Sequence, residues 1–202
     1  MILKKTGWVL FMVLCVSIGL YPYSYFLFER TFGLLASKPA ELLQDTLWNG
    51  MFYTHILLGG FALMIGWSQF SKKWRIKYLK WHRRVGVAYV VSAILSGSSG
   101  LYIAYFATGG MVSVLGFASL AVIWLFATIK AFVAIKNGRI SEHQKFMIFS
   151  YAACFAAVTL RIWLPLLSAA FGSFIPAYRI VAWLCWVPNI VVAFIITRRL
   201  GL

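Results

Sequence analysis

Residues 72–84 read Lys72-Lys73-Trp74-Arg75-Ile76-Lys77-Tyr78-Leu79-Lys80-Trp81-His82-Arg83-Arg84. This basic segment holds seven Lys or Arg residues and no acid in thirteen positions, and a long apolar run lies on each side of it. Neither a protein core nor lipid hydrocarbon can hold so many cations, so we expect a loop in water against lipid headgroups. In a chain this apolar, short loops rich in Lys and Arg stay on the cytoplasmic side of a membrane. The basic segment therefore orients every other part of the chain.

The composition is typical of an integral membrane protein. Hydrophobic residues make up 62% of the 202 residues, the mean hydropathy is +0.86, and only 11% of residues are charged. A soluble domain carries about 25% charged residues. Several apolar runs reach the roughly 20 residues that a helix needs to cross a bilayer. We therefore predict an all-α, polytopic membrane protein with one transmembrane domain over residues 1–202.

Six transmembrane helices are expected, with the N and C termini both on the cytoplasmic side. Their predicted ranges are residues 7–28, 48–70, 85–107, 111–134, 146–168 and 176–197. Of the 19 Lys and Arg residues, 15 then fall on the side of the basic segment. Arg30, Lys38 and Arg179 fall on the other side, and Arg161 falls within a span. This asymmetry follows the positive-inside rule.

The net charge of +15 does not indicate binding to nucleic acid. The basic residues lie at the ends of apolar spans, where they meet anionic lipid. The predicted partners are therefore the lipid bilayer and the anionic headgroups of its cytoplasmic side. Cys15, Cys154 and Cys185 lie inside apolar runs at wide spacing, so neither a disulfide framework nor a Cys-x-x-Cys metal site is expected.

Arg161 is the strongest candidate for a functional residue. It lies about 15 residues into the fifth predicted span, so roughly 22 Å from the basic boundary at about 1.5 Å per residue. A buried Arg costs about 2.5–3.5 kcal/mol to insert and needs a partner or a polar cavity. One interpretation is structural, with bonds to backbone carbonyls or a side chain that reaches the outer boundary. The other is a contact with an anionic or polar ligand.

His55, Ser98 and Ser99 are predicted at a depth similar to that of Arg161. His55 is about seven residues into the second span, roughly 10 Å below the outer boundary. Ser98 and Ser99 reach a similar level in the third span. These residues either form interhelical hydrogen bonds or line a ligand-binding pocket in the outer half of the membrane. Gly59, Gly60 and Gly66 in the second span are expected to let neighbouring helices approach closely.

His82 and His143 form a second candidate pair at the cytoplasmic boundary. Each precedes a span that runs outward, so the two imidazoles are expected at the same depth. Such a pair could hold haem b or a divalent metal ion. The alternative is that each histidine bonds its own helix end beside the headgroups. The two histidines are therefore candidates for binding a cofactor, and the sequence offers no separate metal-binding motif.

No common catalytic motif occurs in the chain. The sequence has no Gly-x-Gly-x-x-Gly, P-loop or His-Glu-x-x-His pattern. Glu29, Glu41 and Asp45 belong to the predicted outer connection, which leaves Glu142 as the one acid on the inner side. Chemistry that needs paired carboxylates is therefore excluded, and the sequence does not decide whether the protein is an enzyme.

Several short elements together resemble a known family. They are His55 with Gly59-Gly60, Gln69-Phe70, the run His82-Arg83-Arg84-Val85-Gly86, the run Glu142-His143-Gln144-Lys145-Phe146-Met147, and Val158-Thr159-Leu160-Arg161. In order and spacing they are similar to the bacterial membrane family called domain of unknown function 2306, over roughly residues 55–164. Phe149 stands where the family pattern often has Arg, which argues against a site with two arginines. The resemblance implies a small multi-span protein of the bacterial plasma membrane and no particular activity.

Three functional hypotheses remain open. The first is binding or transport of a small anionic or quinone-like ligand in an outer pocket around His55, Ser98, Ser99 and Arg161. The second is a redox protein that holds haem b through His82 and His143. The third is a non-catalytic accessory subunit whose lipid-facing surface contacts a partner protein.

Overall fold

A computed structural model describes residues 2–28 and 32–202 of the chain. Glu29 and Arg30, assigned above to the outer connection, lie outside the described residues. Within the described ranges the secondary structure is helical and contains no strand. Six segments in these ranges are long and apolar enough to cross a membrane. The predicted fold class, an all-α protein with six candidate spans, is confirmed.

The six candidate spans follow one another along the chain. The first, Lys5–Phe26, combines α1 (Ile2–Leu20) with the 3-10 helix η1 (Tyr21–Phe26). The short elements η2 (Gly33–Ser37) and α2 (Ala40–Gln44) lead to the second, formed by α3 (Thr46–Gly66) and η3 (Trp67–Phe70). The third and fourth are α5 (Leu79–Ala104) and α6 (Met111–Lys136). The last two combine α7 (Ile140–Cys154) with α8 (Ala156–Phe171), and α9 (Phe174–Leu184) with α10 (Val187–Arg199).

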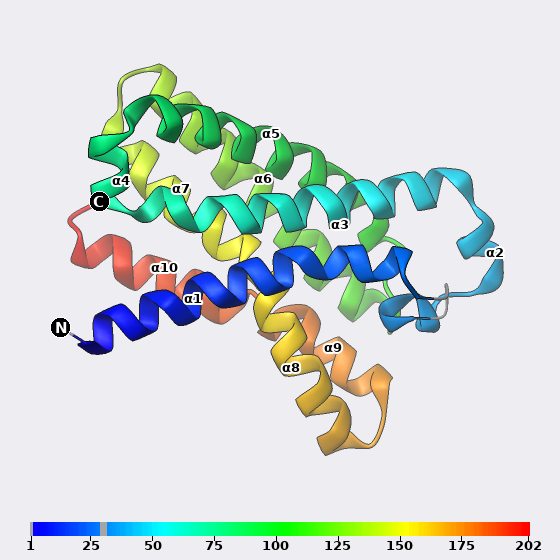
Figure 1. Ribbon diagram of the computed structural model, residues 1–202. Coiled ribbons are helices and arrows are strands. Elements are labelled where there is room, and N and C mark those ends of the chain that lie inside the picture. Colours follow the sequence, from blue (N-terminus) through cyan, green and yellow to red (C-terminus); the bar gives the residue numbers. More distant parts are fainter. Residues whose placement is uncertain (1, 29–31) are drawn as a thin grey trace.

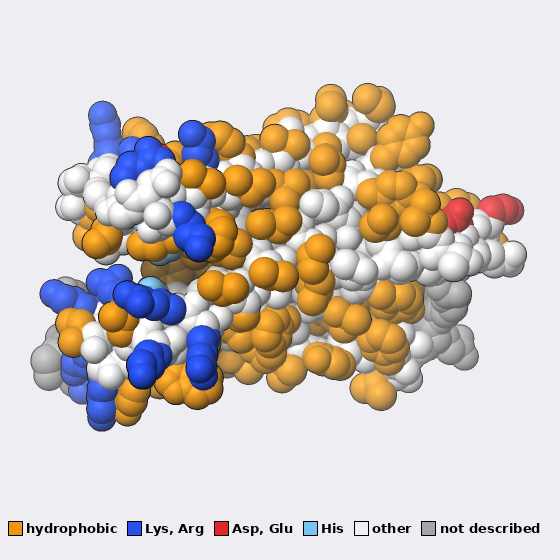
Figure 2. Space-filling model, turned by 90° about the horizontal axis from the view of Figure 1, so that it is seen from above, with side chains coloured by type: hydrophobic (Ala, Val, Ile, Leu, Met, Phe, Trp, Pro, Cys, Tyr) orange, Lys and Arg blue, Asp and Glu red, His pale blue; other side chains and the backbone are white. Residues whose placement is uncertain are grey.

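The two ends of the bundle differ in their charged side chains. Both chain termini and the short helix α4 (Lys72–Lys77) lie at one end, and α2 lies at the other (Figure 1). On the face seen in Figure 2, Lys and Arg side chains gather at the first end, acidic side chains appear at the second, and hydrophobic side chains cover the surface between them. We call these the basic end and the acidic end. The apolar surface between them is the part suited to lipid.

The basic segment is helical, where the sequence predicted a loop. Its first half is α4, and its second half forms the first turns of α5. The Ser71 hydroxyl caps α4 by accepting a hydrogen bond from the Trp74 amide at 3.4 Å. Lys, Arg and Leu are good helix formers, and a helix keeps the backbone bonded while the cations reach water. The charge pattern therefore set the location of this segment but not its conformation.

Glycines on α3 bring three neighbouring helices close to it. A Cβ at Gly60 would lie 2.6 Å from the Gly19 carbonyl oxygen of α1, and one at Gly59 would lie 2.8 Å from Ser96 Oγ of α5. A Cβ at Gly66 would collide with the Tyr151 ring of α7. Small residues of this kind permit close helix packing within membranes. The predicted role of the three glycines is confirmed.

The last two spans are each interrupted part way along their length. α7 and α8 are separated at Phe155, and α9 and α10 at Cys185 and Trp186. Pro188 has no N–H with which to bond the Leu184 carbonyl, which explains the second break. The pair α8 and α9 bends away from the direction of the other helices (Figure 1). This bend opens the bundle toward the acidic end.

The Asn189 side chain contacts polar groups at both interruptions. Its Nδ2 donates to the Cys185 carbonyl at 2.9 Å, to Thr159 Oγ1 at 3.2 Å and to the Ala152 carbonyl at 3.3 Å. The Thr159 hydroxyl also donates to the Cys185 carbonyl. Interrupted helices inside a membrane need such side-chain partners, because no lipid group can bond the freed backbone atoms.

Candidate functional site

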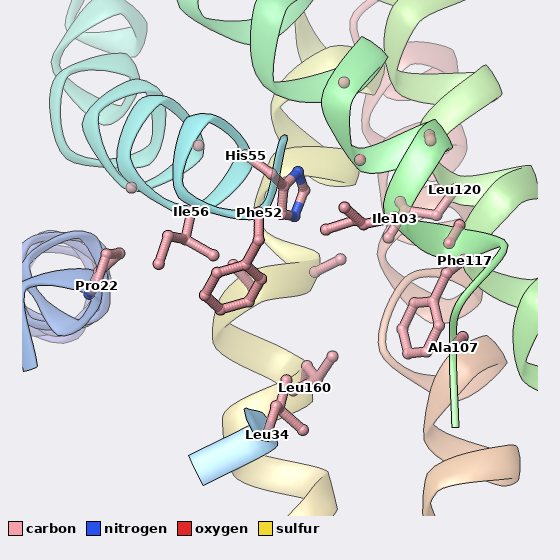
Figure 3. Close-up of a pocket in the computed structure, with 18 of the residues that line it drawn as sticks. Pro22, Leu34, Phe52, His55, Ile56, Ile103, Ala107, Phe117, Leu120 and Leu160 are labelled. Carbon is pink, nitrogen blue, oxygen red and sulfur yellow. The ribbon is translucent and has the colours of Figure 1, made fainter. Parts of the chain in front are cut away.

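A largely apolar cavity of about 210 Å³ lies inside the bundle, toward the acidic end. Helices α3, α5, α6 and α8 contribute to its wall, together with η1 at the end of the first span and η2 from the connection that follows it. Figure 3 shows Phe52, Ile56, Ile103, Phe117 and Leu160 around it. Polar side chains interrupt this apolar wall at His55, Arg161 and Lys38. The cavity therefore suits a mostly apolar ligand with a few polar atoms.

His55 is held by two hydrogen bonds to α5. Its Nδ1 lies 2.9 Å from the Ser96 carbonyl oxygen, and the Ser96 hydroxyl donates to the His55 carbonyl at 2.8 Å. A carbonyl oxygen can only accept, so Nδ1 carries the proton and Nε2 of the neutral ring is left as an acceptor. Figure 3 shows the imidazole projecting from α3 beside Ile103. His55 thus brings a hydrogen-bond acceptor to the cavity.

Gly100 makes room for the imidazole ring. A Cβ at this position of α5 would lie 2.7 Å from His55 Nδ1 and 2.9 Å from Cε1. A separation below 3.0 Å between such atoms forces one of them to move. The position of His55 therefore depends on a small residue one turn along α5 from Ser96.

Arg161 lies in the cavity wall with few partners. Its Nη1 donates to the Ala157 carbonyl of its own helix at 2.9 Å, and its guanidinium carbon lies 4.3 Å from the centre of the Tyr21 ring. Its Nε is buried and has no hydrogen-bond partner. Stacking on an aromatic face stabilises a cation but leaves the N–H groups free to bind an acceptor.

No carboxylate among the described residues pairs with Arg161. The described residues that line the cavity include no acid. The ion pair found within residues 2–28 and 32–202 joins Arg139 to Glu142 at 2.8 Å and belongs to the basic end. The cavity therefore has a positive electrostatic potential.

Lys38 adds a second cation at the cavity wall. Its Nζ donates to the Phe106 carbonyl and to Thr108 Oγ1, the latter at 3.2 Å. These contacts join the connection between η2 and α2 to the end of α5. Burial lowers the pKa of the Lys38 ammonium from its ordinary value to about 8.

Trp48 brings an unused donor to the same cavity wall. Its side chain is 1% exposed, and its ring stacks on Phe52 with centroids 5.1 Å apart. Its indole Nε1 has no hydrogen-bond partner. Buried donors are normally bonded, so an orphan at a cavity wall calls for an unseen acceptor.

Ser98 and Ser99 do not line the cavity. Ser98 is exposed on the outside of the bundle, and the buried Ser99 hydroxyl donates to the Leu95 carbonyl of its own helix at 2.8 Å. The residue of α5 that contacts His55 is Ser96. Two residues along a helix turn the direction of a side chain by about 200°, so Ser98 faces away from Ser96. Counting residues along the span predicted correctly that α5 lies beside His55 at this depth. It did not predict which face of α5 points toward His55.

His82 and His143 both lie at the basic end. His143 Nδ1 is 2.9 Å from the Ala131 carbonyl oxygen of α6. His82 lines a separate pocket of about 290 Å³, which His143 does not line. The two residues are near enough for their charges to interact. In the described part of the chain, no three side chains of His, Cys, Asp and Glu gather in one place.

The sequence identified two polar residues of the cavity wall, His55 and Arg161, and missed Lys38 and Trp48. It also missed Ser96, which bonds His55 from behind the wall. Lys38 follows the short run Gly33–Ser37 in a connection that looked solvent-exposed. The one available signal was that Lys38 directly follows the apolar run Leu34-Leu35-Ala36 and Ser37.

Comparison with known proteins identifies one family. A family model described as "Predicted membrane protein (DUF2306)" matches residues 52–197. The match includes His55, His82, His143 and Arg161, and it begins after Lys38 and Trp48. It confirms the resemblance drawn from the sequence motifs. Neither a curated protein nor a solved structure matches the chain.

Proposed function

Because the chain belongs to the DUF2306 family of predicted membrane proteins, whose description names no activity, we propose a function from the cavity itself. The protein binds a small ligand with an apolar body and an anionic or quinone-like oxygen group. The ligand occupies the cavity near the acidic end, with its oxygen atoms toward Arg161. The residues of the cavity wall support ligand binding. If the protein also transports the ligand, transport would use the same site.

The unpaired state of Arg161 carries the proposal. Keeping an Arg within a membrane costs about 2.5–3.5 kcal/mol. If Arg161 had only a structural role, its N–H groups would be bonded to carbonyl groups of the protein. Nη1 donates to the Ala157 carbonyl, but the buried Nε has no partner. A ligand oxygen would accept hydrogen bonds from these donors, because the described residues of the cavity wall supply no carboxylate.

His55 and Lys38 support the same class of ligand. The free Nε2 of His55 accepts a hydrogen bond, as a quinol hydroxyl requires, and the cations of Arg161 and Lys38 favour a carbonyl or anionic oxygen. The apolar wall around Phe52, Ile56 and Leu160 suits a ring or a hydrocarbon chain. Pockets for small molecules combine a mainly apolar lining with a few polar groups in this way.

We propose that the basic end faces the cytoplasm of a bacterial cell. The clustering of Lys and Arg at that end supports this orientation through the positive-inside rule. The single membrane domain would then open its cavity in the outer half of the plasma membrane.

Ligand binding to the purified protein tests the proposal. The probes are decyl-ubiquinone, oleate and the neutral alcohol dodecanol, and the measurement is the shift of the melting temperature in detergent. We expect clearly larger stabilisation by the quinone or by oleate than by dodecanol, because a carbonyl or carboxylate oxygen accepts more strongly from a cation than a hydroxyl does. The variant Arg161→Leu should keep its fold and lose this shift.

Arg199→Leu is the matched control, since Arg199 is exposed at the basic end and the same substitution is made. Its melting shift should equal that of the unchanged protein. Equal shifts in Arg161→Leu and Arg199→Leu, or equal stabilisation by all three probes, would contradict a site at Arg161.

A further inference from the structure

A second pocket, of about 290 Å³, opens at the basic end, far from the cavity described above. It lies where η3, α4 and the first turns of α5 meet. Its lining residues are Ser68, Gln69, Trp74, Arg75, Tyr78, Trp81, His82 and Val85. Unlike the first cavity, it lies at the boundary between the apolar surface and the basic end, so its contents would contact both lipid and water.

The lining combines the Arg75 cation with amphipathic aromatic rings. Arg75 and His82 are half-buried in the pocket, and the His82 imidazole adds a hydrogen-bonding group to the same wall. The described residues that line the pocket include no acid, and Glu142 of α7 pairs with Arg139. The pocket therefore attracts an anion.

The aromatic side chains place this anion at the membrane surface. Trp74, Tyr78 and Trp81 are 60%, 46% and 63% exposed around the pocket. Trp and Tyr concentrate at the headgroup level of a bilayer, where one part of the ring is apolar and the other is wet. An anion in this pocket therefore lies at the depth of a lipid headgroup.

Gln69 supplies an unused polar group inside the pocket. Its Nε2 donates to the neighbouring Ser68 hydroxyl at 3.2 Å, while its Oε1 is buried without a partner. A buried amide oxygen of this kind normally has a hydrogen-bond donor. A hydroxyl of a lipid headgroup, beside the phosphate, would fill that position.

We propose that this pocket is a binding site for an anionic phospholipid of the phosphatidylglycerol type. Arg75 and His82 contact the phosphodiester, and Gln69 accepts a hydrogen bond from a headgroup hydroxyl. The acyl chains continue along the exposed face of α5, where Val87 and Val91 are 52% and 51% exposed. The site is independent of the ligand proposed for the cavity near Arg161.

Native mass spectrometry of the purified full chain tests the proposal, with phosphatidylglycerol and phosphatidylcholine of equal chain length as probes. We expect preferential retention of phosphatidylglycerol. Arg75→Ala should weaken it about tenfold, as expected for one hydrogen bond between charged groups. Lys73→Ala removes an equal charge from the exposed side of the same helix and should leave the preference nearly unchanged.

Gln69→Leu separates a binding role from a structural one. The substitution removes a buried unpartnered oxygen, so the melting temperature should hold or rise while retention of phosphatidylglycerol falls. If Arg75→Ala and Lys73→Ala lose phosphatidylglycerol retention equally, the lipid preference comes from surface charge in general and not from this pocket. That result would overturn the proposal. Displacement of the lipid by glycerol 3-phosphate in water would assign the pocket to a soluble phosphate and overturn it as well.

Discussion

Lys38 lies outside the membrane-spanning segments, yet its ammonium group is packed against the end of α5. Burial disfavours its charged form and lowers its pKa to about 8. In the unfolded chain the same group has a pKa near 10.5. Between these two values the unfolded chain binds the proton more firmly than the folded protein does.

This difference predicts a pH dependence of stability. Below about pH 8 the folded state contains a buried charge, which lowers the free energy of unfolding. As the pH rises from about 8 toward 10.5 the ammonium loses its proton in the folded state, and the free energy of unfolding increases. The melting temperature of the unchanged protein, relative to that of Lys38→Met, should therefore increase over this range and stay constant below it. A difference that is flat from pH 7 to pH 10 would show that Lys38 is not buried as described.

Gly100 tests the placement of His55. Gly100→Ala puts a Cβ 2.7 Å from the imidazole, and His55 cannot retreat without losing its bond to Ser96. We expect a loss of about 1–3 kcal/mol of stability, the usual cost of overpacking, and weaker ligand binding. Unfolding in detergent and binding of the preferred probe provide the two measurements.

Gly50→Ala is the matched control for this substitution. Gly50 lies in α3, and a Cβ there meets nothing within 4 Å. Removal of a helix glycine without a clash should raise stability by up to about 1 kcal/mol. If both variants behave alike, the close contact between Gly100 and His55 has no energetic consequence.

At the level of whole helices, the interruptions in the last two spans distinguish this bundle from six straight rods. Freed carbonyl groups at Ala152 and Cys185 are bonded by the side chains of Thr159 and Asn189. The bend that results carries α8, and with it Arg161, to its place in the cavity wall. The geometry of the site is therefore linked to Thr159, two residues before Arg161 on α8, and to Asn189 of the last span.

A double-mutant cycle measures this link. Thr159→Val and Asn189→Leu should each reduce stability by about 0.6–1.7 kcal/mol, the range for hydrogen bonds inside membranes. The double variant should lose less than the two single losses together, because the side chains bond each other and share the Cys185 carbonyl. Strict additivity in reversible unfolding would mean that the two breaks are held independently.

For the whole molecule, the separation of charge between the ends predicts its orientation. In a background in which Cys15, Cys154 and Cys185 are replaced by Ala, Lys77→Cys should resist a membrane-impermeant thiol reagent in intact cells. Ala40→Cys, in α2 at the acidic end, should react. Both should react once the membrane is permeabilised. Labelling of Lys77→Cys in intact cells would reverse the proposed orientation.

The sequence by itself determined the fold class and the number of candidate spans. Apolar length and the placement of Lys and Arg report directly on how each segment meets lipid and water, because these costs depend on local composition. The resemblance to the DUF2306 family was also readable from short motifs. Arg161 was identifiable because a cation within an apolar span has an unfavourable insertion free energy whichever direction its side chain points.

Only the tertiary structure decided which residues share a site. Depth along a helix can be counted from the sequence, but direction depends on packing, and so Ser96 rather than Ser98 or Ser99 meets His55. Lys38 reaches the cavity from the connection before α2, and Trp48 reaches it from the first turn of α3. The freed carbonyls of Ala152 and Cys185 find donors on Asn189 and Thr159, and two of these contacts join different spans. Such contacts join residues far apart in the chain, and their energies exist only once the helices are packed together.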